Sequence, residues 1–204
     1  MHGHVLENRR TEDAGVIAFI DESILMQPAG VYVLAAVVVD GDLDSQRHTV
    51  RSAVPRRRGR RWHWHSEDHD DRCTMLDVMN RLQLDFVVSW SSVTHPRGQE
   101  RSRAIALQRL LWEFKEMAIT EVVFESRRTV HDNRDRATIA HAQRAGQASV
   151  PLSYHFALPT DEPFLWLADT LAGASRAAIG AGDDAYLHRL RAERVRICPA
   201  DQAR

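Results

Sequence analysis

The nine residues Val31–Val39, VYVLAAVVV, form the longest uninterrupted apolar stretch of the chain. The stretch is rich in β-branched residues and far shorter than the ~20 residues needed to cross a bilayer, so it predicts a buried strand. Val16–Ile20 has the same character, and Pro28 and Gly30 lie between the two segments. This pattern predicts a β-hairpin near the N-terminus.

After the hairpin, segments with the period of a helix alternate with segments typical of a strand. Strands are expected at 84–93, 120–126 and 153–159, and helices at 75–82, 99–118, 132–144 and 163–179. This order predicts an α/β domain whose mixed sheet has about five strands and helices on both faces. With 204 residues the chain has the length of one domain, expected at 15–204 after a polar N-terminal arm at 1–14.

Composition argues against several classes of protein. Cys73 and Cys198 are the two cysteines and lie far apart in the sequence, so neither a disulfide scaffold nor a four-cysteine zinc site is expected. The N-terminus lacks the apolar core of a secretory signal, and we expect a cytoplasmic protein without a membrane partner. The formal net charge of −1 does not favour binding of nucleic acid by bulk charge. The sequence leaves open whether the chain forms a homo-oligomer.

Carboxylates interrupt the apolar pattern at three places. Asp21 and Glu22 follow the first strand, Glu125 ends the segment at 120–126, and Asp169 lies in the last helix among apolar residues. An unpaired carboxylate in apolar surroundings is costly, so a positive partner is expected. That partner can be an arginine such as Arg127, two residues after Glu125 on the same side of a strand, or the acids can simply lie in water. Alternatively, Asp21, Glu125 and Asp169 converge on Mg²⁺ or Mn²⁺, which prefer oxygen ligands.

Five segments, in their order along the chain, carry a resemblance to a known family. The segments IAFIDES, VYVLAAVVV, RRWHW, VVFESR and LWLADTLAGA resemble the domain-of-unknown-function family 3800, which is related to the ribonuclease H-like superfamily. The similarity covers most of the chain, from Ile17 to Ala178. It implies a ribonuclease H-like sheet in which strands one and four are neighbours that bring carboxylates to one edge, while the last helix adds another.

The resemblance also implies roles for individual acids. Asp21, Glu125 and Asp169 match the family's acids and would be catalytic ligands of Mg²⁺ or Mn²⁺. Asp132 matches the position of a further aspartate, with Asp135 as its competitor. Glu22 is another candidate ligand, but adjacent strand residues point to opposite faces, so it could pair with an arginine instead.

The segment PRRRGRRWHWHSEDHDD combines arginines, histidines and acids. A run of this kind is typical of a solvated loop, but beside a metal site it could hold a nucleic-acid backbone. His63 matches a histidine of the family and could orient a phosphate or transfer a proton. Alternatively, His63, His65 and His69 could bind zinc or iron. The arginines of this loop are Arg56, Arg57, Arg58, Arg60 and Arg61.

These features predict a metal-dependent nuclease or phosphodiesterase that cleaves RNA or DNA with a metal-activated water. Arg127 or the arginine loop would neutralise the phosphate. One alternative is a catalytically inactive ribonuclease H-like module that binds nucleic acid or protein, with arginines satisfying the three acids. Another is a hydrolase of nucleotides or small phosphoesters, an alternative that a narrow, closed pocket would favour.

Overall fold

A six-stranded mixed sheet, with the order β5-β4-β1-β2-β3-β6, forms the centre of the computed structural model. The structure describes residues 16–27, 30–54 and 62–201, so the predicted arm at 1–14 lies outside the described residues. Strands β1, β2 and β3 are antiparallel neighbours, while β4 and β5 extend the sheet in parallel beyond β1 and β6 pairs in parallel with β3. The strands are β1 (Ile17–Leu25), β2 (Val31–Val39), β3 (Asp85–Ser92), β4 (Glu121–Glu125), β5 (Ser153–Ala157) and β6 (Val195–Pro199).

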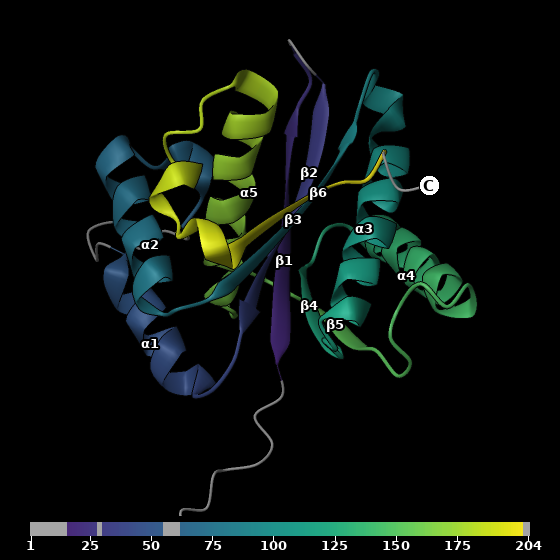
Figure 1. The fold of residues 1–204 in the computed structure, drawn as a ribbon, viewed down its shortest axis with the longest axis horizontal. Helices are drawn as coiled ribbons and strands as arrows, with labels where there is room; N and C mark the ends of the chain where they lie inside the picture. The colour runs from purple at the N-terminus through teal and green to yellow at the C-terminus, as the bar shows by residue number, and fades with distance from the viewer. Residues whose placement is uncertain (1–15, 28–29, 55–61, 202–204) are drawn as a thin grey trace, which may run out of the picture.

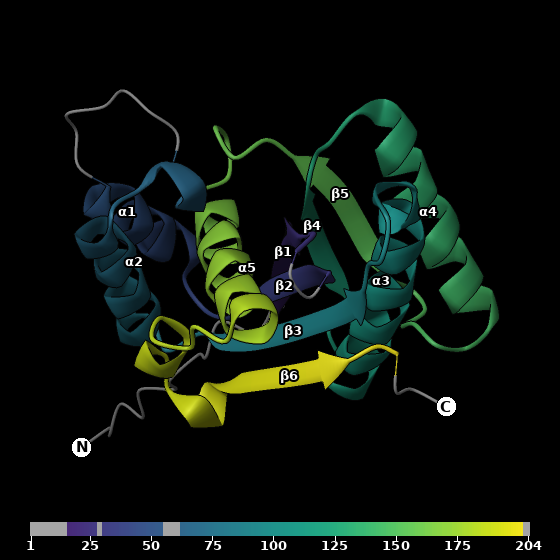
Figure 2. The same ribbon diagram turned by 90° about the horizontal axis from the view of Figure 1, so that it is seen from above.

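Helices cover both faces of the sheet. Figure 1 shows α1, α2 and α5 on one face and α3 and α4 on the other, and Figure 2 shows α5 between the sheet and the α1–α2 pair. No helix within the described part of the chain combines the length and apolarity needed to cross a membrane. The helices are α1 (Leu43–Ala53), α2 (His69–Arg81), α3 (Gln99–Glu116), α4 (Thr129–Arg144) and α5 (Phe164–Ala181).

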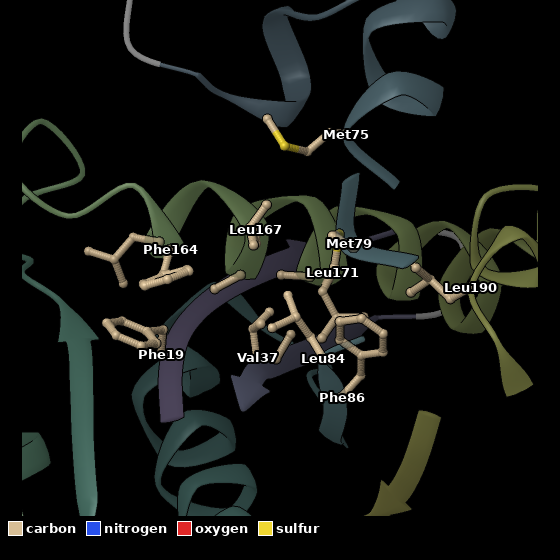
Figure 3. Close-up of a cluster of buried hydrophobic side chains, with 14 of the residues drawn as sticks. Phe19, Val37, Met75, Met79, Leu84, Phe86, Phe164, Leu167, Leu171 and Leu190 are labelled. Atoms are coloured by element: carbon tan, nitrogen blue, oxygen red, sulfur yellow. The ribbon is translucent and has the colours of Figure 1, made fainter. Parts of the chain in front are cut away.

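The alternation of side chains along β1 supplies two separate apolar cores. Ile17 and Phe19 belong to the core beneath α5, whereas Ala18 and Ile20 belong to the core beneath α3 and α4. In the first core the rings of Phe19 and Phe164 lie 4.7 Å apart between their centroids (Figure 3). Burial on both faces explains why β2 is apolar at every position.

The structure confirms the predicted α/β class and the helices on both faces, with six strands in the sheet. Strands β1 and β4 are neighbours, as the ribonuclease H-like resemblance implied. The predicted end of the first strand was wrong: β1 continues to Leu25 because β2 pairs with it as far as Val31. Asp21 and Glu22 therefore lie inside a strand. Helix α1 and strand β6 were not predicted.

Helix α5 also packs closely against Trp64, which begins the short 3-10 helix η2 (Trp64–Ser66). Gly173 makes this possible, because a Cβ built there would lie 2.3 Å from Cγ of Trp64. Because Gly173 has no side chain, η2 can pack directly against the helix.

Replacing Gly173 by alanine tests this packing. A glycine-to-alanine exchange inside a helix ordinarily stabilises it by ~1 kcal/mol. We expect Gly173→Ala to destabilise the protein by about 1–3 kcal/mol instead, because the indole must move. Gly98→Ala is the control, since its Cβ would meet no atom within 4 Å. Thermal unfolding measures both, and a melting temperature of Gly173→Ala at or above that of the parent would contradict the packing.

Candidate functional site

Three acids from distant parts of the sequence face one cavity. Asp21 follows Phe19 by two residues and therefore points toward the α5 face of the sheet. Glu125 has the same relation to Val123 in β4, and Asp169 lies on α5. The cavity measures about 280 Å³, and its lining includes Asp21, Glu125, Asp169, His63, His65 and Arg127. The structure thus brings together the three acids and the histidine that the sequence singled out.

The negative charges in this cavity reinforce one another. Burial raises the pKa of Asp21 well above its usual value, and the charges of Glu125 and Asp169 raise it further. The backbone N–H of Glu22 donates to Oδ1 of Asp21 at 2.7 Å and offsets only part of this effect. Within the described residues, neither Asp21 nor Asp169 forms an ion pair with an arginine. The cavity therefore carries an excess of negative charge.

Asp169 connects α5 to the segment that carries His63. Its Oδ2 accepts a hydrogen bond from the backbone N–H of Trp64 at 2.7 Å and lies 3.1 Å from Nδ1 of His63. The side chain of Asp169 is 10% exposed, whereas that of His63 is 53% exposed. The buried carboxylate therefore orients an accessible imidazole at the rim of the cavity.

Glu22 points to the opposite face of the sheet and lies in a buried ionic network. Arg103 of α3 pairs with Glu22 and also binds Asp135 of α4 through Nε and Nη2, at 2.8 and 2.7 Å. The hydroxyl of Tyr32 donates to Oε2 of Glu22 at 2.5 Å. Glu22 therefore has the arginine partner that the sequence offered as one alternative, and it also lines the cavity of the acids. Asp135 lies in this network too, and not in the lining of the cavity.

Asp132 and Arg127 hold the turn between β4 and α4. Asp132 is buried and accepts hydrogen bonds from the backbone N–H of Arg127 at 3.0 Å and from the hydroxyl of Ser126 at 3.1 Å. The guanidinium of Arg127 pairs with Glu100 and Asp135, at 3.1 and 3.2 Å. Asp132 is thus a structural part of the turn in this arrangement, and much of the charge of Arg127 is already balanced.

The histidines divide between two places. The rings of His63 and His65 lie 5.5 Å apart at the cavity, whereas Nδ1 of His69 lies 3.0 Å from the hydroxyl of Tyr186. His69 is not part of the cavity lining, so the three histidines do not gather as a zinc or iron site would require. The predicted nucleic-acid ligands Arg56, Arg57, Arg58, Arg60 and Arg61 lie outside the described residues.

The donor chemistry of the cavity suits a hard divalent cation, although the ligands are not arranged around one. Carboxylate oxygens are the ligands that Mg²⁺ prefers. In the described parts of the chain, no three His, Cys, Asp or Glu side chains are positioned to hold a metal ion as they stand. Burial, and after it the charges of Glu125 and Asp169, raise the pKa of Asp21, and a bound cation would favour the ionised carboxylates. The residues present therefore fit Mg²⁺ or Mn²⁺ in charge and in donor type.

Comparison with known proteins finds similarity to a solved structure but not to a protein family. No protein-family model matches the chain, and no curated protein matches it. The chain is similar to a solved structure of the PCNA:RNase HII complex from Archaeoglobus fulgidus, with a TM-score of 0.49 and 15% sequence identity. The match covers 79% of this chain and 72% of that chain. Chains can agree to this extent without sharing an activity.

The ionic network of Arg103 yields a stability prediction. We expect Arg103→Met to destabilise the protein by about 3 kcal/mol, because Glu22 and the buried Asp135 would lose their nearest counter-charge and keep only Arg127, at 3.9 and 3.2 Å. Neutralising both acids in the same variant, with Glu22→Gln and Asp135→Asn, is expected to recover much of this loss. Arg189→Met is the control, because Arg189 pairs with Asp77 at the exposed surface and its loss costs less than about 1 kcal/mol. Urea unfolding measures all variants, and equal effects at Arg103 and Arg189 would contradict the network.

The raised pKa of Asp21 yields a pH prediction. A carboxyl whose pKa is raised on folding stabilises the fold when protonated, and this contribution is lost as the pH rises through the folded pKa. We therefore expect Asp21→Asn, measured in EDTA, to melt at a higher temperature than the parent at about pH 8. The difference should shrink toward about pH 4, near the ordinary pKa of an aspartate. Asp40→Asn, at the exposed end of β2, is the control. A lower melting temperature for Asp21→Asn at about pH 8 would contradict the electrostatic description.

Proposed function

We propose that this protein is a divalent-metal-dependent nuclease that hydrolyses phosphodiester bonds of RNA or DNA. One observation carries the proposal: Asp21, Glu125 and Asp169 face a single cavity, where burial and then the charges of the other two acids raise the pKa of Asp21. The resemblance of the segments that carry these acids to the domain-of-unknown-function family 3800 supports it, and membership of that family is part of the proposal. So is a cytoplasmic location, which rests on the composition.

The shape of the hollow favours a polymer over a single nucleotide. A second cavity of about 380 Å³ shares Glu22, Ile24 and Arg127 with the cavity of the acids. Arg128 and His131 also line this second cavity. The hollow therefore continues past the end of β4 toward the α3–α4 face of the sheet. An extended hollow of this kind suits a chain of nucleotides better than a compact phosphoester.

The residues of the cavity have distinct parts in the proposed reaction. Asp21, Glu125 and Asp169 would hold Mg²⁺ or Mn²⁺, which would activate the attacking water and neutralise charge on the phosphate. Asp169 keeps the ring of His63 in one orientation through Nδ1. From the exposed rim, His63 would move a proton through Nε2 to or from a reacting oxygen. Glu22 also lines the cavity, but its pairing with Arg103 would balance its charge, so that the ligands would be the acids of the α5 face.

Cleavage assays test the proposal. We expect the purified protein to cleave a fluorescein-labelled single-stranded RNA, single-stranded DNA or RNA–DNA hybrid in Mn²⁺ or Mg²⁺, and none of them in EDTA. Asp21→Asn and Asp169→Asn should each slow cleavage by at least about a hundredfold, because each removes a charged ligand. Both should also weaken Mn²⁺ binding measured by calorimetry.

Asp40→Asn serves as the matched control, since Asp40 is an exposed acid beyond β2 at the opposite end of the sheet. It should leave both cleavage and Mn²⁺ binding unchanged. The proposal is wrong if no labelled substrate is cleaved with either metal and the two cavity variants bind Mn²⁺ as the parent does. Cleavage of a nucleoside triphosphate alone, with every polymer left intact, would support the small-phosphoester alternative.

A further inference from the structure

Arg72 of α2 and Arg176 of α5 place two positive charges near each other on neighbouring helices. Burial lowers the pKa of Arg176, and the nearby charge of Arg72 lowers it further. Within the described residues, neither guanidinium forms an ion pair, and the buried Nε of Arg176 has no hydrogen-bond partner. Two like charges held together in a partly buried place are costly unless an anion joins them.

The position of Arg176 relates this pair to the cavity of the acids. Arg176 follows Asp169 by seven residues on α5, so both lie on the same face of the helix. Seven residues correspond to about 10 Å along a helix axis. Gly173 lies between them, where the ring of Trp64 packs against the helix.

Arg72 is held in place by Trp64. Its guanidinium carbon lies 4.6 Å from the centroid of the Trp64 ring, and its Nε donates to the backbone carbonyl of Trp64 at 3.1 Å. Arg72 lies on α2, which packs beside α5 (Figures 1 and 2). Because Nε donates to this carbonyl and no acceptor among the described residues binds the two terminal nitrogens, these nitrogens can bind a ligand. A guanidinium fixed by stacking loses less entropy when it binds an anion.

His65 connects the arginine pair with the acids. It lines the cavity, and burial lowers its pKa, as do the charges of Arg176 and then His63. His65, whose neutral form is favoured, therefore lies between the positive charges of Arg72 and Arg176 and the cavity of Asp21 and Asp169.

We propose that Arg72 and Arg176, with His65 beside them, bind a backbone phosphate of the nucleic acid next to the phosphodiester that is cleaved. This inference rests on the proposed function, because it takes the substrate of the neighbouring cavity to be a polynucleotide. Planar guanidinium groups offer paired N–H donors that match the oxygens of a phosphate. The acids would hold the reacting phosphate through the metal ion, while the arginines fix the direction in which the strand leaves the cavity along α5.

Binding measured without cleavage tests this inference. Fluorescence anisotropy of short fluorescein-labelled single-stranded RNA and DNA, in EDTA and over a series of salt concentrations, gives the affinity and its salt dependence. We expect Arg176→Gln and Arg72→Gln each to weaken binding of the bound oligonucleotide about tenfold, since each removes a charged hydrogen-bond donor. The slope of log K against log salt should fall in magnitude by about 0.7 when the phosphate contact is lost.

Matched variants separate charge from packing. Arg144→Gln, at the exposed end of α4 on the other face of the sheet, should bind as the parent does. Arg176→Lys and Arg72→Lys should keep the parental salt slope with a smaller loss of affinity, because the charge remains. If Arg72→Gln fails to fold after losing its stacking on Trp64, Arg176→Gln alone decides the test.

The outcomes distinguish this inference from the proposed nuclease function. Weaker binding and a lower salt slope for Arg176→Gln support the phosphate site even if the parent cleaves nothing in Mn²⁺. Parental affinity and slope for Arg176→Gln overturn the phosphate site even if the parent is an active nuclease. Absence of binding to both oligonucleotides by the parent overturns it as well.

Discussion

Adjacent residues of a strand point to opposite faces of its sheet, and at Asp21 and Glu22 this alternation separates two carboxylates. Glu22 turns toward α3, where Arg103 and Tyr32 bind it. Asp21 turns toward α5, where it meets other acids and, among the described residues, forms no ion pair with an arginine. One face of β1 is thereby electrically balanced and contributes to stability, while the other retains charge that a cation can neutralise. The site exists because the strand does not end between the two residues.

Three residues on one face of helix α5, at successive turns, have different roles. Asp169 contributes a carboxylate to the cavity and holds the backbone of Trp64, so the ligand and the segment beside it are fixed together. Gly173, one turn later, admits the ring of Trp64, and Arg176, one turn further, adds a positive charge. Under the proposed function, the acids would hold one phosphate of a polynucleotide through a metal ion, and Arg176 would bind a neighbouring phosphate directly.

The long elements were predictable because their apolar residues recur with the period of a strand or helix. Helix α1 was missed because Val50 is its one fully buried residue among those described, which leaves almost no apolar period to detect. Strand β6 was missed because it lies at the sheet edge, where Arg196 and Ile197 are exposed. The end of β1 was misjudged since two acids in succession resemble a strand end, whereas pairing with β2 carries the strand on to Leu25.

The acids of the cavity were identifiable because each interrupts an apolar pattern. The sequence did not show, however, which acids pair with an arginine and which do not. Arg103 provides a signal of its own: residues 106, 107 and 110 follow it on the same face of α3 and are apolar and buried. A buried arginine implies a buried acid, but its partners Glu22 and Asp135 lie 81 and 32 positions away. Periodicity therefore shows which charged side chains are buried, and tertiary structure shows which of them an arginine balances. Among the described residues, no arginine pairs with Asp21 or Asp169, the two acids that, with Glu125, face the cavity.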